Sequence, residues 1–184
     1  MRVIAGSRRS IRLTTVKGEQ VRPTTDRIKE TLFNILQPYV AGASFLDLFS
    51  GSGAIGIEAL SRGAKEAVLV ERDREALSCI RANLKATRFE NEAQVKEGDV
   101  LSVLRTLRHE PFDLIFLDPP YDCGWEEKVL SVLGTAEYVD EYTKIIVEAS
   151  AETEFSYAEE LGFSVYREKC YGSNKHVFLE KRKV

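Results

Sequence analysis

Residues 47–58 read Asp-Leu-Phe-Ser-Gly-Ser-Gly-Ala-Ile-Gly-Ile-Glu, and this stretch decides the fold. The apolar run Phe45–Phe49 predicts a buried strand, after which a glycine-rich turn leads into a helix. Gly51, Gly53 and Gly56 have the G-x-G-x-x-G spacing that brings a backbone close to a ligand at a helix N-terminus. The stretch therefore predicts a strand–turn–helix unit with a ligand site at the turn.

Strands and helices alternate along the rest of the chain. Further short apolar runs predict buried strands at Ala67–Val70, Asp113–Leu117 and Ile145–Val147. Helices are expected near Ala54–Ser61, Arg74–Ala86, Val100–Leu107 and Glu126–Leu133. This alternation predicts an α/β fold in which helices cover both faces of a parallel sheet. The last segments, Phe163–Lys169 and His176–Glu180, predict an antiparallel hairpin at one end.

The composition excludes several classes of protein. The chain has 184 residues, of which 43% are hydrophobic and 30% charged, as in a globular protein of one domain or one domain with an appendage. No apolar run approaches the roughly 18 residues of a membrane span, and the N-terminus lacks a signal peptide's apolar centre. Three widely spaced cysteines and two histidines predict no disulfide framework and no metal site. The default expectation is a soluble, cytoplasmic protein.

The net charge of −3 conceals an asymmetry between the two ends of the chain. Residues 1–29 carry a net charge of +6, which leaves −9 for residues 30–184. A basic arm on an acidic body is typical of a nucleic-acid contact, although a solvated, charged N-terminus of no consequence fits the charge equally well.

The basic arm itself reads as a β-hairpin. Two short strands are expected at Arg2–Ala5 and Ile11–Thr15, around a Gly-Ser-Arg-Arg turn. Arg22 precedes a proline and so ends the arm in an extended segment, after which Thr25 can cap a helix. The predicted boundaries are therefore residues 1–24 for the arm and 25–184 for the main domain.

Acidic residues at predicted strand ends indicate which ligand binds the glycine turn. Asp47 would repel a pyrophosphate, but it suits a ligand that combines a carboxylate with a cationic amine or sulfonium, as the methionine end of S-adenosylmethionine does. Glu71, at the tip of the next strand, is placed to accept from two ribose hydroxyls or is an ordinary solvent-facing glutamate. Asp99 is either a helix N-cap or an acceptor for the adenine amine.

The sequence Asp118-Pro119-Pro120-Tyr121 follows directly on the apolar run Leu-Ile-Phe-Leu. Two prolines end the strand's hydrogen bonding and hold a stiff, extended backbone. The Asp118 carboxylate and the Pro119 carbonyl can accept N–H bonds from an aromatic amine and so orient its lone pair, while Tyr121 can stack on the base. The alternative is a tight turn with an incidental tyrosine.

These motifs together resemble class I S-adenosylmethionine-dependent methyltransferases that act on exocyclic amines. More closely, Arg2-Val-Ile-Ala-Gly, Asp47-Leu-Phe-Ser-Gly-Ser-Gly and residues 22–36 (Arg-Pro-Thr-Thr-Asp-Arg-Ile-Lys-Glu-Thr-Leu-Phe-Asn-Ile-Leu) are similar to the RsmD family, bacterial methyltransferases of guanine N2 in 16S ribosomal RNA. The resemblance covers nearly the whole chain, although Asp-Pro-Pro-Tyr is shared with DNA adenine methyltransferases. Residues 7–10, Ser-Arg-Arg-Ser, depart from the family's glycine-containing turn but keep its charge.

The resemblance implies a fold, a cofactor and a partner. The fold is a Rossmann-like, mostly parallel seven-stranded sheet with an antiparallel C-terminal hairpin, helices on both faces and an N-terminal β-hairpin extension. The cofactor is S-adenosyl-L-methionine. The partner is 16S ribosomal RNA, naked or within an assembling small subunit, and the protein is expected to be a monomer without membrane contact.

The resemblance also assigns residues to roles. The catalytic residues would be Asp118, Pro119, Pro120 and Tyr121. The cofactor-binding residues would be Asp47, Phe49, Ser50, Gly51, Gly53, Glu71, Arg72, Asp99, Val100 and Asp118. The RNA-binding residues would be Arg8, Arg9, Arg12 and Arg22. In the implied mechanism, the methyl group passes directly to a guanine N2 on an unpaired or flipped base, and an ionised Asp118 accepts the amine N–H.

Three other functions fit part of the sequence. A DNA or RNA adenine-N6 methyltransferase shares Asp-Pro-Pro-Tyr, but no segment is left over for a DNA target-recognition domain. A nicotinamide-dependent oxidoreductase would use the glycine turn and Glu71, but it leaves Asp-Pro-Pro-Tyr unexplained. A non-catalytic RNA-binding module would explain the arm but not the acidic strand ends.

Overall fold

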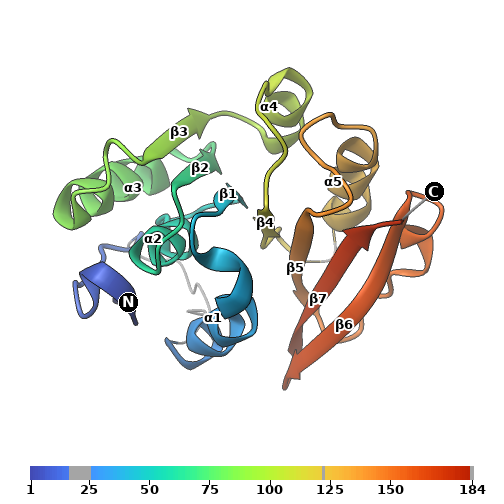
Figure 1. Ribbon diagram of the computed structural model, residues 1–184, viewed down its shortest axis with the longest axis horizontal. Coiled ribbons are helices and arrows are strands. Elements are labelled where there is room, and N and C mark those ends of the chain that lie inside the picture. Colours follow the sequence, from blue (N-terminus) through green and yellow to red (C-terminus); the bar gives the residue numbers. More distant parts are fainter. Residues whose placement is uncertain (17–25, 122, 183–184) are drawn as a thin grey trace.

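The strand order of the sheet determines where a ligand can bind. The computed structural model describes residues 1–16, 26–121 and 123–182, and its sheet has the order β3-β2-β1-β4-β5-β7-β6 (Figure 1). The strands are β1 (Ser44–Leu48), β2 (Glu66–Glu71), β3 (Ala93–Glu97), β4 (Leu114–Leu117), β5 (Lys144–Ser150), β6 (Phe163–Tyr171) and β7 (Asn174–Lys181). Strands β1 to β5 are parallel, and β7 pairs antiparallel with both β5 and β6. The order reverses between β1 and β4, where ligands of such sheets bind.

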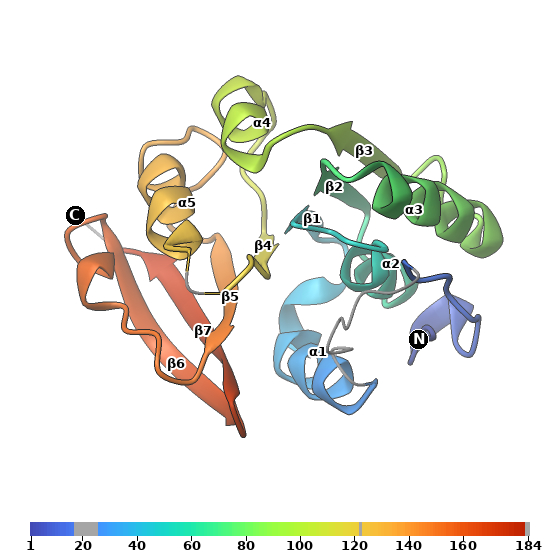
Figure 2. The ribbon, with the colours of Figure 1, turned by 180° about the vertical axis from the view of Figure 1, so that it is seen from behind.

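Helices cover both faces of this sheet (Figure 2). They are α1 (Asp26–Val40), α2 (Ala54–Ser61), α3 (Arg74–Thr87), α4 (Val100–Thr106) and α5 (Trp125–Gly134), with short 3-10 turns at Gly6–Arg8 and Ser156–Ala158. Helices α1, α2 and α3 share one apolar core, while α4 and α5 share the core on the opposite face. Within the described ranges, no helix is long and apolar enough to cross a bilayer.

The mostly parallel seven-stranded sheet with an antiparallel C-terminal hairpin is confirmed. One strand, β3, has no apolar run in the sequence because it lies at the sheet edge, where its side chains are half-buried or exposed. Helix α1 buries Leu32, Phe33, Leu36 and Val40 together with Lys29, and Pro38 lies within the helix near its C-terminal end.

The N-terminal hairpin is reduced to a single antiparallel bridge between Arg2 and Arg12. The 3-10 turn Gly6–Arg8 connects the two expected strands. Backbone hydrogen bonds such as that from the Val3 N–H to the Ile11 carbonyl (2.9 Å) still join the two segments. The expected extended segment around Arg22 and the Thr25 cap lie outside the described residues.

This N-terminal segment is docked on the body of the protein. Glu58 of α2 is buried, and its carboxylate accepts hydrogen bonds from the N–H groups of Ile4 (2.8 Å) and Ala5 (3.0 Å). The same carboxylate pairs with buried Lys29 of α1 and with Arg62. A buried carboxylate is stable only when such partners surround it, so Glu58 ties residues 1–16 to α1 and α2.

A second contact ties the segment to the glycine turn. Asn83 of α3 is 1% exposed, and its Oδ1 accepts from the Thr14 N–H (2.7 Å). Its Nδ2 donates to the carbonyls of Thr14 (2.8 Å) and Ser52 (2.9 Å). One side chain therefore connects the N-terminal segment to the predicted ligand site.

Candidate active site

Neighbouring parallel strands present the expected site residues at one edge of the sheet. β1 leads into Phe49–Gly53, β2 ends at Glu71, β3 is followed by Asp99, and β4 is followed by Asp118–Tyr121. Because the carboxyl ends of parallel strands lie at the same edge, residues separated by 70 positions in the sequence share one region.

The glycine turn is held by the strand beside it. The Ser50 N–H donates to the Val70 carbonyl (2.9 Å), and the Gly51 N–H donates to Glu71 Oε2 (2.8 Å). The Ser50 hydroxyl donates to the Asp47 carbonyl (2.7 Å). The turn is thus fixed by β2 and by its own strand.

Backbone conformation and close packing explain the residue types in this turn. Gly53 precedes α2 with a φ of 78°, a left-handed conformation that favours glycine. Phe49 also has a positive φ, 59°, and its ring packs edge-on against Trp125 with the ring centres 5.5 Å apart. A Cβ at Gly56 would lie 2.2 Å from a methyl carbon of Leu69, so any larger residue would force the buried Leu69 side chain to shift.

Asp47 is buried beneath the turn, with 1% of its surface exposed. Its Oδ2 accepts a hydrogen bond from the Gly56 N–H (3.0 Å). Burial raises the pKa of Asp47 to about 8, and repulsion by Glu71 adds to the rise, while the bond from Gly56 opposes it. At neutral pH this carboxyl is therefore mostly protonated within the protein itself, and a nearby cation would favour its ionised form.

Glu71 is engaged with the backbone rather than open to solvent. Its Oε1 accepts from the N–H groups of Arg72 (2.8 Å) and Asp73 (2.9 Å), and its Oε2 accepts from the Gly51 N–H. A carboxylate offers about four acceptor positions. Three of these positions are used within the protein, and one remains on Oε2. The Arg72 side chain is exposed.

Asp99 is the N-cap of α4, one of its two expected roles. Its Oδ1 accepts from the Ser102 N–H (3.1 Å), and the helix begins at buried Val100. The cap uses Oδ1, so a contact from Oδ2 to an adenine amine is compatible with it.

The segment Asp118–Tyr121 follows β4, the strand that pairs with β1 and so ends beside the glycine turn. Asp118 is half-buried, Pro119 is buried, Pro120 is exposed and Tyr121 is half-buried. Burial raises the pKa of Asp118 well above its ordinary value, and repulsion by Glu148 and then by Asp47 raises it further. The expected ionised Asp118 is consequently disfavoured within the protein alone, because the site gathers several carboxyls in a poorly solvated region.

The sequence did not point to a hydrogen-bond network that supports Tyr121. Asn174 Nδ2 donates to the Tyr121 hydroxyl (2.7 Å) and to Glu148 Oε1 (3.4 Å). Glu148 Oε2 lies 3.1 Å from Nε2 of fully buried His176, whose Nδ1 lies 3.3 Å from the Tyr171 hydroxyl. The polar residues Glu148, Asn174 and His176, each buried in the sheet, were the signal that could have identified this network.

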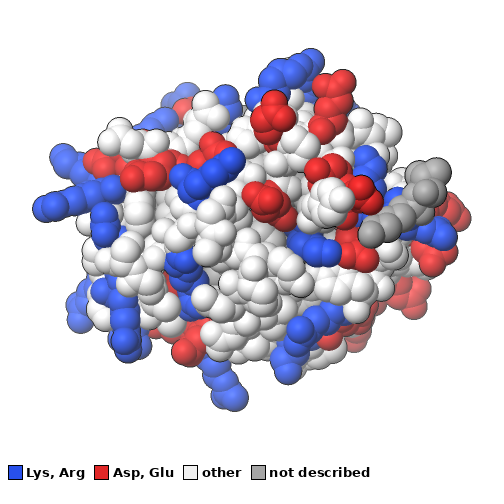
Figure 3. Space-filling view, viewed as in Figure 1, with Lys and Arg blue, Asp and Glu red and all other residues white. Residues whose placement is uncertain are grey.

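The expected RNA-binding arginines differ in their surroundings. Arg8 donates through Nε to the Thr87 carbonyl (2.6 Å), and its guanidinium lies over the Phe89 ring, so Arg8 anchors the segment to the end of α3. Arg9 and Arg12 are exposed, and Arg22 lies outside the described residues. Figure 3 shows Lys and Arg side chains along its left margin, where α3 and the N-terminal segment lie.

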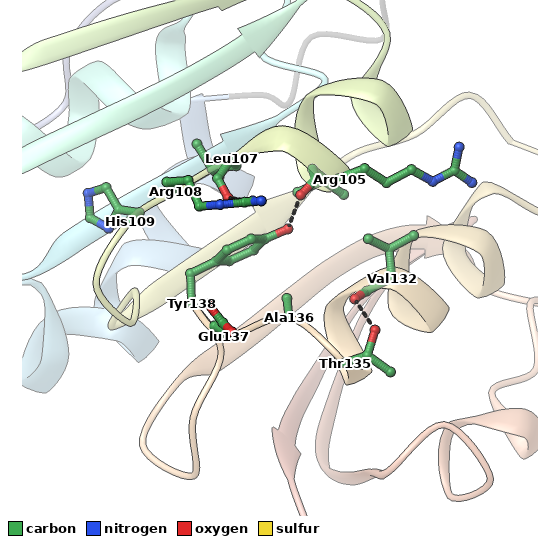
Figure 4. Close-up of a pocket in the computed structure, with 10 residues that line it drawn as sticks. Arg105, Leu107, Arg108, His109, Val132, Thr135, Ala136, Glu137 and Tyr138 are labelled. Carbon is green, nitrogen blue, oxygen red and sulfur yellow. Dashed lines mark hydrogen bonds between the residues drawn. The ribbon is translucent and has the colours of Figure 1, made fainter.

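A pocket of about 500 Å³ lies at the opposite, amino edge of the sheet (Figure 4). The ends of α4 and α5 line it, with Arg105, Arg108, His109, Glu137 and Tyr138, whose hydroxyl donates to the Leu104 carbonyl (2.7 Å). None of the expected site residues lines this pocket, so its size does not identify it as the active site.

Comparison with known proteins identifies the family of this chain. The family described as "Conserved hypothetical protein 95" matches residues 1–180. "Ribosomal RNA small subunit methyltransferase D" of Haemophilus influenzae is 38% identical over 154 residues, which are 83% of this chain and 80% of that protein. The protein of the same name from Escherichia coli K12 is 37% identical over 172 residues, 94% of this chain and 85% of that protein.

A solved structure agrees in both sequence and fold. The "Putative methyltransferase yhhF" of Escherichia coli superposes with a TM-score of 0.84 and 35% identity, covering 98% of this chain and 97% of that one. The match includes the N-terminal segment as well as the Rossmann-like sheet. The chain therefore belongs to the RsmD family of methyltransferases.

Proposed function

We propose that this chain transfers a methyl group from S-adenosylmethionine to the exocyclic N2 of a guanine in 16S ribosomal RNA. The observation that carries the proposal is the position of Asp118-Pro-Pro-Tyr121 at the same sheet edge as the glycine turn and Asp47. The names of the relatives support ribosomal RNA as the substrate.

The residues at the sheet edge fit S-adenosylmethionine chemically. Buried Asp47 and half-buried Asp118 offer carboxyls to its two cationic groups, and the first-turn N–H groups of α2 suit its carboxylate. A Cβ at Gly51 would meet no atom of the described residues within 4 Å, so these residues leave the turn open on that side. Glu71 would accept from the ribose and Asp99 from the adenine. When bound, the cofactor supplies an electrophilic methyl group.

The remaining expected cofactor contacts surround these carboxyls. Phe49, Ser50 and Gly53 form part of the glycine turn. Arg72 directly follows Glu71, and Val100 directly follows Asp99. A nicotinamide dinucleotide fits less well, because its pyrophosphate would lie close to Asp47 and bring like charges together.

The acceptor amine would be oriented by Asp118 and the Pro119 carbonyl. In this role each group accepts one N–H bond, which directs the nitrogen lone pair at the methyl carbon. The nitrogen attacks in line, the new N–C bond forms as the C–S bond breaks, and the proton passes to Asp118 or to water. Tyr121, held through its hydroxyl by Asn174, would stack on the base and fix its plane.

Nearby cations would restore the charge that this mechanism requires. The pKa of Asp118 is raised mainly by burial and by neighbouring carboxyls. A sulfonium and an ammonium beside Asp47 and Asp118 would lower both pKa values, so the ionised Asp118 forms when the cofactor binds. The base must be unpaired or flipped to reach it. Arg9 and Arg12 would contact phosphates of the surrounding RNA.

Nucleoside analysis tests the proposal. The protein is incubated with S-adenosylmethionine and either naked 16S RNA or small subunits from cells that lack it, and the modified nucleosides are measured by mass spectrometry. We expect N2-methylguanosine at one position with the natural chain and none with Asp118→Ala. N6-methyladenosine as the product, or equal product from Asp118→Ala, would overturn the proposal.

A further inference from the structure

A groove separates the first turn of α1 from the tip of the β6–β7 hairpin. It has a volume of about 380 Å³ and is lined by Arg27, Ile28, Thr31, Lys169, Cys170 and Tyr171. Figure 1 shows α1 and the lower end of the hairpin facing each other across this part of the molecule. The size lies within the roughly 300–1,000 Å³ of typical ligand sites.

The groove opens at the edge of the sheet that holds the candidate active site. Asn174 at the hairpin tip pairs with Ser150, the last residue of β5, so the tip lies at the carboxyl edge. Tyr171 lines the groove, and its hydroxyl joins the network that continues through His176 and Glu148. That network ends at Asn174, which holds Tyr121.

The two walls of the groove carry positive charge. Arg27 on α1 and Lys169 on β6 are exposed, and neither forms an ion pair with another described residue. None of the described lining residues is acidic, whereas the pocket at the amino edge contains Glu137 beside its arginines. Ile28 and Tyr171 also line the groove and give it less polar surface.

We propose that this groove binds the single strand of RNA next to the target nucleotide, with Arg27 and Lys169 contacting its phosphates. The inference rests on the proposed function, since it assumes an RNA substrate whose reactive base enters beside Tyr121. Two cations on facing walls suit a polyanion that passes between them, and the surface between them suits a base. The RNA would then be gripped at two places, by Arg9 and Arg12 and by this groove.

Charge removal with a matched control tests the groove. We expect Arg27→Gln combined with Lys169→Gln to weaken RNA binding and to reduce the salt slope of log Kd by about 1.4, the value for two lost single-strand phosphate contacts. Affinity for S-adenosylmethionine and turnover at saturating RNA should stay within about twofold. The control is Arg105→Gln combined with Arg108→Gln, which removes the same charge from the pocket in Figure 4 and should leave the slope unchanged.

Cysteine protection gives a second readout that needs no methyl transfer. Cys170 lies in the groove, Cys123 is the other exposed thiol and Cys79 is buried. In a Cys123→Ser variant, bound 16S RNA should slow the alkylation of Cys170 by iodoacetamide at least fivefold. Equal salt slopes in the two charge-removal pairs, or no protection of Cys170 at RNA concentrations that saturate binding, would overturn the proposal. Protection of Cys170 without N2-methylguanosine formation would instead contradict the proposed reaction and leave the groove in place.

Discussion

At the scale of single residues, the candidate site contains two carboxyls, Asp47 and Asp118, whose pKa values are raised so that their protonated forms are favoured. Asp47 lies at the end of a buried strand, so its position follows from the sequence, but its protonation does not. Protonation depends on burial and on Glu71 and Glu148, which come from other strands. Residue type and spacing could therefore place Asp47 and Asp118 at the carboxyl edge of the sheet, while their charge required the packed structure.

The first prediction is that cofactor affinity rises with pH. Because the pKa of Asp47 is raised to about 8, binding of a cationic ligand that ionises it releases a proton. The Kd for S-adenosylmethionine should fall between pH 6 and pH 8 by at most about tenfold per pH unit for one proton, and level off above the pKa. Calorimetry in buffers of different ionisation enthalpy measures the released proton directly.

The Asp47→Asn variant is the control for this pH dependence. It should bind S-adenosylmethionine more weakly and lose the Asp47 part of the pH dependence. Without cofactor, the raised pKa of Asp47 should lower the free energy of unfolding of the natural protein as pH rises from about 4 towards 8. The Asp47→Asn variant should show a smaller decrease over the same pH range. An unchanged pH profile in the variant would show that Asp47 does not supply the proton.

The second prediction concerns Asn174 as a positioning residue. Asn174→Ala removes the 2.7 Å bond to the Tyr121 hydroxyl, so the ring loses its fixed orientation. We expect kcat/KM for RNA to fall by about 10- to 100-fold, as small displacements of a positioning group do, with S-adenosylmethionine affinity within about twofold. Steady-state kinetics with each substrate varied separates the two effects.

A double-mutant cycle distinguishes this role from a general loss of structure. Tyr121→Phe removes the other partner of the same hydrogen bond and keeps the ring. If Asn174 acts through Tyr121, adding Asn174→Ala to Tyr121→Phe should cost much less than Asn174→Ala alone. Additive losses would contradict the positioning role.

At the scale of elements, regular patterns predicted most of the sheet and its helices. The four apolar runs became β1, β2, β4 and β5 because strands buried on both faces must be apolar. The sequence of β3 lacks an apolar run because β3 is an exposed edge strand. The two N-terminal segments are too short for their sequence to distinguish a pair of strands from a single bridge. Polar residues within apolar strands, such as Glu148 and His176, are a sequence signal for the network around Asn174, but its pairing could not be foreseen because it joins segments distant in sequence.

The third prediction concerns the charges buried beneath the N-terminal segment. Glu58→Ala leaves Lys29 buried without its carboxylate and frees the N–H groups of Ile4 and Ala5. Removing one partner of a buried ion pair costs about 3–5 kcal/mol, so the free energy of unfolding in urea should fall by that amount. Glu97→Ala, which breaks only the exposed pair with Arg81, should cost about 0–1 kcal/mol. Similar decreases in the free energy of unfolding of both variants would show that the buried contacts of Glu58 do not stabilise the protein more than an exposed ion pair does.

At the scale of the whole molecule, the separation of charge agrees with the proposed partners. In the proposed complex the acidic residues at the sheet edge would face a cationic cofactor, while basic side chains project from the N-terminal segment and α3 (Figure 3). Net charge alone would have argued against a polyanion. Its distribution along the sequence was informative, but only the structure shows that Arg8 is already bound to the body.

The fourth prediction separates the arginines of the N-terminal segment. Arg9→Gln combined with Arg12→Gln should lower RNA affinity and flatten its salt dependence, with little effect on stability, because both side chains are exposed. Arg8→Gln should instead lower the melting temperature, because it removes the bond to the Thr87 carbonyl and the contact with Phe89. Salt-dependent binding and thermal unfolding together measure both effects, and a reversed pattern would contradict this assignment.

The contact made by Asn83 has a consequence for how the molecule opens. One amide holds both Thr14 and Ser52, so the departure of either segment frees the side chain that fixes the other. The two should therefore exchange their amide hydrogens as one cooperative unit, with similar opening free energies, although they are far apart in sequence. A fluctuation that releases residues 1–16 would therefore also loosen the glycine turn, so the proposed RNA contact and the proposed cofactor site would open in a single event.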